Sequence, residues 1–417
     1  MTSHARRLLA TAACAATVLG SLVAAGTGAS AATRPSDSWG SEYGGGSNAS
    51  ADLGERTITA KTAARMSPVW RHTVHGEARA PSIVDGVAYR ADNPNNANDR
   101  QRLVATKAST GATLWGVRLP AGQTYEDGQT VVDGLVLMPF STQRALGGIT
   151  AVDLRSHKVV WNRARYARYT VASGKEDGTA YPIVVGNGRV YLAAGDRSVA
   201  AYRVRTGAPI WHRTTSDYSQ SIAAGDDDVF SVGEHGLVAY SGSSGHERWS
   251  SAYGTDDVLL AAGRIFATDG NDTVALAEKG CGHATCRPLW RTPVPSGDDG
   301  EQDLLGGASS SSVFVLSSPA AHTSVLRRLT AKNGHVAWSV TVARSGSRPV
   351  RVGDTVWLSV GATELEAWSA SATRSAPLVT IPEHSGGGAL QGIAAGDGTL
   401  TLTTWPNHLV GYRVGKG

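Results

Sequence analysis

The chain has 417 residues, and its 39 Lys and Arg residues against 35 Asp and Glu residues give a formal net charge of +4. A charge this small, with no basic cluster interleaved with aromatic residues, argues against nucleic acid or an anionic membrane surface as a partner. The 50 glycines, together with abundant Ala, Thr and Val, favour packed β-sheets joined by many turns.

The first 31 residues have the features of an export signal. A basic start with Arg6 and Arg7 is followed by an apolar, alanine-rich core over Leu8–Ala25, which is poorly suited to a membrane anchor. Ala29-Ser30-Ala31 matches the small-residue pattern of a cleavage site. We expect a signal peptide over residues 1–31 that is cleaved after Ala31, and a secreted protein without an integral membrane segment. The general secretion route and the twin-arginine route both remain open.

Residues 32–67 follow, and their first part is rich in Ser, Gly and Asn. This composition predicts an exposed N-terminal arm that wraps around the following domain. No linker long enough to divide the chain occurs later, so residues 68–417 are expected to form one domain.

That domain contains a repeated hairpin. In VAAYRVRTGAPIW, which spans Val199–Trp211, apolar residues alternate along a strand, Thr206-Gly207 forms a tight turn, and a second strand returns to the tryptophan. Further copies end about forty to fifty residues apart, and a degenerate one has Leu378 at the tryptophan position. The copies that end in tryptophan do so at Trp115, Trp161, Trp211, Trp249, Trp290 and Trp338.

Two further strands precede each hairpin, so the repeat unit has four strands. Eight units predict an all-β fold, an eight-bladed β-propeller of four-stranded antiparallel blades. The last copy, Leu409–Val414, stops before its turn, and Val69–Val74 is the expected partner strand. Pairing of the two chain ends would close the ring and remove its exposed edges. The repeated tryptophans are expected to pack between blades rather than form a ligand platform.

The recurring pattern GxVYxxxxDGxLxAxxxxTGxxxW resembles the repeat of quinoprotein-type (PQQ-like) eight-bladed β-propellers, within the wider WD40/YVTN-like repeat architecture. The lead-in SWGSEYGGGSNASADLGERTITAKTAARMSPVW is also similar, so the likeness covers Trp39 to Val414. In that family, the resemblance implies, the dehydrogenases hold a quinone with adjacent cysteines, bind Ca²⁺ through acid and amide side chains, and use an aspartate base. This sequence has no adjacent cysteine pair. No cofactor is therefore expected, with Ca²⁺ or PQQ as the alternative.

Two cysteines, Cys281 and Cys286, remain after removal of the signal, since Cys14 lies within it and lacks a lipobox. They flank the lengthened hairpin turn of the fifth blade, and in an oxidising compartment such a pair favours a disulfide. The alternative is a metal site that uses both cysteines and His283.

Acid and amide residues recur in the loops that join blade to blade, and in the loop between the second and third strands of the first blade. These loops gather on one face of a propeller, which suggests a polar mouth for a cation, a basic peptide or a polyhydroxylated ligand. The alternative is that Asp, Asn and Gly simply favour turns. The candidate ligand-binding residues are Asp92, Asn95, Asp99, Glu126, Asp127, Glu176, Asp177, Asp256, Asp257, Asp299 and Glu301.

The sequence shows no catalytic motif, and no catalytic residue is assigned. The favoured function is a non-catalytic binding or scaffolding module for a protein, a small molecule or a polysaccharide, acting as a monomer. The alternative is a quinoprotein-type oxidoreductase with an atypical site. A carbohydrate-active enzyme is a third hypothesis, and it would require two carboxylates at catalytic separation in one pocket.

Overall fold

The computed structural model divides the chain into two compact units, Met1–Arg34 and Pro35–Gly417. The residues whose structure is described belong to the second unit, and the predicted signal peptide lies outside them. They are residues 40, 47–74, 80–92, 101–125, 128–142, 147–164, 180–194, 197–216, 219, 221–294, 303–320, 323–343, 347–361, 363–371, 376–382, 390–404 and 407–415.

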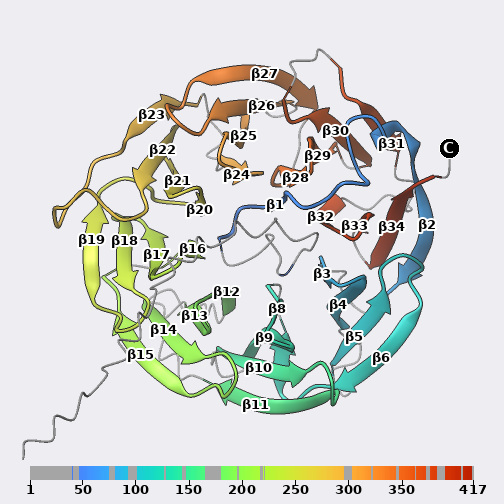
Figure 1. The fold of residues 1–417 in the computed structure, drawn as a ribbon, viewed down its shortest axis with the longest axis horizontal. Coiled ribbons are helices and arrows are strands. Elements are labelled where there is room, and N and C mark those ends of the chain that lie inside the picture. Colours follow the sequence, from blue (N-terminus) through green and yellow to red (C-terminus); the bar gives the residue numbers. More distant parts are fainter. Residues whose placement is uncertain are drawn as a thin grey trace, which may run out of the picture. The chain divides into compact units, whose positions relative to one another are not determined.

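The described strands form eight antiparallel blades around a ring (Figure 1). The blades are numbered along the chain, and the strands of each blade are given from the innermost to the outermost. Blade 1 contains β3 (Ser82–Val84), β4 (Val87–Asp92), β5 (Arg102–Lys107) and β6 (Thr113–Arg118). Blade 2 contains β7 (Gln123–Tyr125), β8 (Thr130–Val132), β9 (Leu135–Thr142), β10 (Gly148–Asp153) and β11 (Lys158–Ala164). Blade 3 contains β12 (Ala180–Gly186), β13 (Arg189–Ala194), β14 (Ser198–Arg203) and β15 (Pro209–Thr214). Blade 4 contains β16 (Ser221–Ala224), β17 (Asp228–Gly233), β18 (Gly236–Ser241) and β19 (Glu247–Ser251).

The second half of the ring repeats this arrangement. Blade 5 contains β20 (Val258–Ala261), β21 (Arg264–Asp269), β22 (Asp272–Ala277) and β23 (Trp290–Pro293). Blade 6 contains β24 (Leu304–Gly306), β25 (Ser312–Ala320), β26 (Thr323–Thr330) and β27 (Val336–Ala343). Blade 7 contains β28 (Val350–Val352), β29 (Thr355–Val360), β30 (Glu364–Ser369) and β31 (Val379–Pro382), and β1 (Ala51–Asp52) is added to its inner edge. Blade 8 contains β32 (Leu390–Gly396), β33 (Thr399–Thr404), β34 (His408–Val414) and β2 (Met66–Thr73).

The two chain ends close the ring in blade 8, as predicted. β2 pairs antiparallel with β34, from Met66 opposite Val414 to Thr73 opposite His408. The strand begins three residues before the predicted Val69. It follows η1 (Ala63–Arg65), a short 3₁₀ turn. Within the described ranges, no helix has the length and apolar character needed to span a membrane.

Burial decreases from the second strand of a blade to the outermost strand. Every residue of β17, β29 and β33 is buried, because neighbouring blades cover both faces of these strands. The outermost strands β6 and β15 alternate between exposed and half-buried residues. The all-β eight-bladed prediction is therefore confirmed, with the core divided among the interfaces between blades.

The repeated tryptophans pack against the following blade, as predicted. The indole N–H of Trp211 in blade 3 donates a hydrogen bond to the carbonyl of Gly242 in blade 4 at 2.8 Å. Its ring covers Gly245, which has a φ of +69° in the hairpin turn, and a Cβ atom there would lie 2.6 Å from the ring. Glycine is therefore required both for the turn and for the contact. Trp161 contacts Gly207 of blade 3 in the same manner.

Candidate functional site at the centre of the ring

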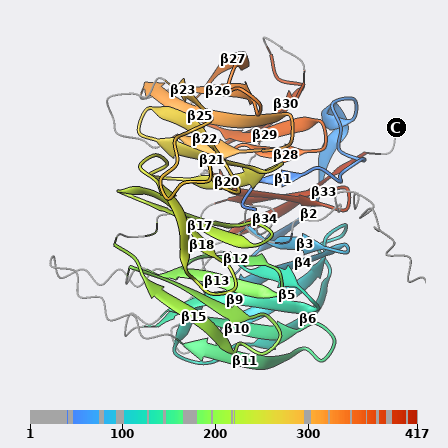
Figure 2. The same cartoon turned by 60° about the vertical axis from the view of Figure 1, so that its left-hand side comes forward.

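The centre of the ring contains part of the chain's own N-terminal segment. Residues 47–58, here called the central segment, run along the inner strands of blades 5, 6 and 7, and Figures 1 and 2 both show β1 beside β28. β1 pairs in parallel with β28. The backbone bonds that precede this pairing run from Leu260 N to Ser47 O at 2.8 Å, from Ala308 N to Ala49 O at 3.0 Å, and from Arg351 N to Ser50 O at 2.9 Å.

Buried and half-buried residues alternate along residues 47–53 of the central segment, although Asn48 and Ser50 have positive φ angles of 56° and 48° and only Ala51–Asp52 forms a strand. Asn48, Ser50 and Asp52 are at most 5% exposed. The side-chain amide of Asn48 donates a 2.7 Å hydrogen bond to the carbonyl of Val258 in blade 5. The intervening residues Ser47, Ala49, Ala51 and Leu53 instead line a cavity.

Two carboxylates hold the end of the central segment. Asp52 Oδ1 accepts hydrogen bonds from the backbone N–H groups of Gly54 at 3.0 Å and Glu55 at 3.1 Å, which fixes a tight turn. Glu55 is 1% exposed. Its carboxylate accepts from the backbone N–H of Ile58 at 3.0 Å and from that of Gly398 in blade 8 at 2.8 Å. Together with a 3.4 Å hydrogen bond from Asn48 to Ser221 of blade 4, these contacts tie the central segment to five blades.

The prediction of an exposed arm over residues 32–67 is wrong for the central segment. The small and polar residues that suggested a solvated arm are the ones that fit among closely spaced inner strands and pair with their backbone groups. The predicted bounds of the signal, the arm and the propeller domain stay predictions.

The structure describes three of the residues predicted for the polar mouth: Asp92, Asp256 and Asp257. Asp92 ends β4 and pairs with Arg90 of the same strand at 3.2 Å. Asp256 and Asp257 directly precede the inner strand β20, so they lie at one end of the inner strands, where the mouth was predicted. The others lie outside the described residues: Asn95, Asp99, Glu126, Asp127, Glu176, Asp177, Asp299 and Glu301.

Asp257 is already paired with a cation. Arg348, which precedes β28 in blade 7, reaches it with N–O distances of 3.0 and 3.1 Å. Ser221 of blade 4 donates a further hydrogen bond to this carboxylate at 3.2 Å. A buried carboxylate held by a guanidinium in this way is charge-neutralised. The sequence reasoning missed Arg348, although its place before an inner strand resembles that of Asp257.

Asp303 precedes the inner strand β24 as Asp257 precedes β20, but it has no comparable partner. It is 3% exposed, and neither carboxylate oxygen has a hydrogen-bond partner among the described residues. Burial raises the pKa of Asp303 to about 7; the Asp256 carboxylate adds to this, and the Arg327 guanidinium opposes it. Burial also raises the pKa of Asp256.

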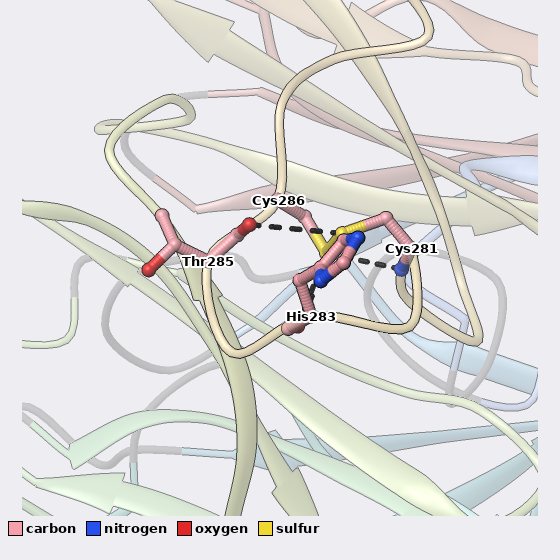
Figure 3. Close-up of a disulfide and its surroundings, with 4 residues drawn as sticks. All are labelled: Cys281, His283, Thr285 and Cys286. Atoms are coloured by element: carbon pink, nitrogen blue, oxygen red, sulfur yellow. Dashed lines mark hydrogen bonds between the residues drawn. A yellow bond between two sulfur atoms is a disulfide. The ribbon is translucent and has the colours of Figure 1, made fainter.

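The described residues contain no group of three or more His, Cys, Asp or Glu side chains that could hold a metal ion. Cys281 and Cys286 form a disulfide with a Cα–Cα distance of 5.7 Å, as predicted (Figure 3). The metal alternative for these cysteines is therefore wrong, because both thiols are consumed. The carbonyl of His283 lies 3.7 Å from the Cys286 sulfur, so the turn wraps closely around the bond.

The larger cavity lies at the opposite end of the inner strands from the predicted mouth. It has a volume of about 710 Å³ and is lined by the central segment and by the turns that join first and second strands in blades 3 to 6. A second cavity of about 430 Å³ lies beside it and shares Leu53, Ser309 and Ser310 with it. The sequence reasoning missed this end of the ring because its loops are short and rich in Gly and Ala.

The family model described as outer membrane protein assembly factor BamB (PQQ_2) matches residues 18–251 and 195–356. The chain belongs to this family. No curated protein matches the chain.

Solved structures share the fold of this PQQ_2 chain at low sequence identity. BamB from Moraxella catarrhalis is 12% identical with a TM-score of 0.58, covering 84% of this chain and 99% of that one. The quinohemoprotein alcohol dehydrogenase ADHIIG from Pseudomonas putida HK5 is also 12% identical with a TM-score of 0.64, covering 91% and 81%. The computationally designed Ika8 protein is 10% identical with a TM-score of 0.60, covering 83% and 98%. These likenesses concern the fold alone.

The quinone of the PQQ-like dehydrogenases does not fit the described residues of this family member. The two cysteines of the propeller are joined to each other in the outer hairpin of blade 5. The centre of the ring is occupied by the central segment, and Asn48 and the Asp257–Arg348 ion pair add buried polar groups there. A flat cofactor would have to displace these hydrogen-bonded groups.

Proposed function

We propose that this PQQ_2 protein is an exported, non-catalytic binding or scaffolding module that acts as a monomer. The observation that carries the proposal is the central segment, which fills the centre of the ring with the chain's own hydrogen-bonded backbone. A propeller whose centre is filled in this way offers the ends of the ring and its loops as binding surfaces.

The comparisons with known proteins also support a binding or scaffolding role. The matched family is described as an outer membrane protein assembly factor, and BamB from Moraxella catarrhalis is covered almost completely by this chain. Export is supported by the predicted signal over residues 1–31 and by the disulfide, which is typical of proteins in oxidising compartments. The quinoprotein-type oxidoreductase remains the second candidate, since the fold is shared with the dehydrogenase ADHIIG.

Thermal unfolding of the purified chain without residues 1–31 separates the two candidates. The protein is heated with Ca²⁺ alone, with pyrroloquinoline quinone alone, with both, and with neither. A ligand that binds only the folded state stabilises it by about 2.7 kcal/mol at a concentration of 100 Kd. We expect no change in the midpoint with the combination beyond that of the single additions. An upward shift that requires both components would overturn the proposed function and favour the oxidoreductase.

A further inference from the structure

The floor of the larger cavity is formed by alternate residues of the central segment. Ser47, Ala49 and Ala51 face into it, while the residues between them are buried on the other side of the central segment. The walls are the turns at Gly186, Gly225 and Gly263 and at Ser309. A volume of about 710 Å³ is within the range of roughly 300–1,000 Å³ that is usual for small-molecule sites.

The charge of this cavity has one sign. Asp226 and Glu278 are its charged lining residues, and none of the described residues that line it is Lys, Arg or His. Lys279, next to Glu278 in the sequence, is exposed and is not among the lining residues. The charged side chains that line the cavity therefore favour a cation at the Glu278 side, while the Arg351 guanidinium donates a hydrogen bond to the lining residue Ser309 at 2.7 Å.

Glu278 is held in place by its surroundings. Its carboxylate lies over Gly225 so closely that a Cβ atom there would overlap with it. It accepts a hydrogen bond from the backbone N–H of Asp226. Burial raises the pKa of Glu278, and the Asp226 and Asp228 carboxylates add to the rise, while the hydrogen bond from Asp226 and the Lys279 ammonium group oppose it. The ionised form is thus destabilised in the absence of a counter-charge, and a bound cation would relieve this cost.

We propose that the cavity binds a protonated primary amine, with Glu278 and Asp226 as the carboxylates that accept hydrogen bonds from the ammonium group. Ca²⁺ suits the cavity less well, because it takes six to eight oxygen ligands and the described residues contain no group of three or more His, Cys, Asp or Glu side chains that could hold a metal ion. An ammonium group needs three acceptors. The alkyl stem next to it would lie on the apolar floor formed by Ala49, Ala51 and Leu53. This inference rests on the proposed binding function and names the ligand chemistry of one of its surfaces.

Isothermal titration calorimetry at low ionic strength tests the proposal with two probes, cadaverine and the peptide acetyl-Gly-Lys-Gly-amide. We expect at least one to bind the full exported chain, and Glu278→Gln to weaken that binding tenfold or more. Glu234→Gln is the matched control. Glu234 is exposed in the turn between β17 and β18, away from the cavity lining, so the same change of net charge should alter Kd less than twofold.

A second variant keeps the net charge constant. Gly225→Ala displaces the Glu278 carboxylate without removing it, and Gly225 has no positive φ that alanine would strain. We expect the same tenfold loss of amine binding, with thermal unfolding used to show that the variant is folded. Tighter binding of the lysyl peptide than of cadaverine would support the amine site and indicate a lysine side chain of a protein as the source.

Absence of binding by both probes, or equal binding by the wild type and Glu278→Gln, would overturn the amine site. Neither result would touch the proposed function, whose failure is a joint shift with Ca²⁺ and quinone.

Discussion

Replacing Asp303 by asparagine tests whether a buried, unpaired carboxylate destabilises the ring at neutral and alkaline pH. Asp303 is 3% exposed, and its two carboxylate oxygens have no hydrogen-bond partner among the described residues. Arg327 is near enough to favour the charged form, but burial and Asp256 outweigh it and raise the pKa of Asp303 to about 7. The ionised carboxylate is therefore a net cost to the folded state.

The sign of the pH dependence follows from the raised pKa. The folded state holds the proton more tightly than the unfolded chain, in which the pKa is 3.8. The contribution of Asp303 to stability is therefore greatest below pH 4 and is lost as the pH rises through 7. A rise of about three pKa units, at 1.36 kcal/mol each, corresponds to about 4 kcal/mol at pH 8 and to less than half of that at pH 5.

Urea unfolding of the wild type and the Asp303→Asn variant at pH 5 and pH 8 measures this effect. Since asparagine cannot ionise, we expect the variant to be more stable than the wild type by about 2–4 kcal/mol at pH 8. The advantage should shrink by about 2–3 kcal/mol at pH 5. Asp227 is exposed, so the control Asp227→Asn should follow the wild-type curve within about 0.5 kcal/mol.

Two results would refute the reasoning on Asp303. One is an Asp303→Asn variant that is less stable than the wild type at pH 8, which would mean that the ionised carboxylate is satisfied in the folded protein. The other is an advantage of equal size at both pH values, which would mean that the gain comes from packing and not from the charge.

Four further variants probe the ring by urea unfolding. Gly245→Ala should cost about 3 kcal/mol, because it adds a clash with the tryptophan of the preceding blade to the strain of a positive φ. Gly263→Ala should cost only about 1 kcal/mol, since Gly263 has a φ of +74° with no atom within 4 Å of an added Cβ; equal costs would contradict the tryptophan contact. Replacing both Cys281 and Cys286 by serine should cost about 2 kcal/mol or less, because the closed loop is short, and a larger loss would assign the disulfide a role beyond loop closure. Glu55→Gln should cost about 1.5–3 kcal/mol through weaker hydrogen bonds to backbone N–H groups, and no change would show that the central segment is not held there.

The repeat made the fold predictable from the sequence alone. A hairpin such as Val199–Trp211 carries its strand pattern, its turn and its inter-blade contact within thirteen residues. The pairing of the chain ends followed from the incomplete last copy, because an unpaired outer strand implies a partner elsewhere. Even the degenerate seventh copy fits, since Leu378 packs against the core beside blade 7 without the indole of a tryptophan. Local signals of this kind can be recognised in a sequence without knowledge of tertiary contacts.

The site was less predictable because it depends on contacts between residues far apart in the chain. Asp256 and Asp257 were identified as neighbours, but the sequence gives no sign that Arg348, 91 residues after Asp257, neutralises the second of them. Glu278 drew no attention, since it is a single acid at the end of a strand. Its role depends on Gly225, which lies in another blade. Charge counts along the chain therefore mark where acids occur but not which of them remain unpaired.

The central segment explains why composition misled the prediction for residues 32–67. Serine, alanine and asparagine are typical of solvated linkers, yet a segment that runs along the inner strands of a propeller needs the same residues. Alternate side chains must be small enough to pass between inner strands, and every backbone group must find a partner there. Asn48, Ser50 and Asp52 meet the first condition and are buried, and the carbonyls of Ser47, Ala49 and Ser50 meet the second. A Ser- and Ala-rich lead-in before a closed repeat is therefore as compatible with a segment inside the ring as with an arm around it. In this chain Glu55 distinguishes the two arrangements, because its carboxylate accepts a hydrogen bond from a turn of the last blade.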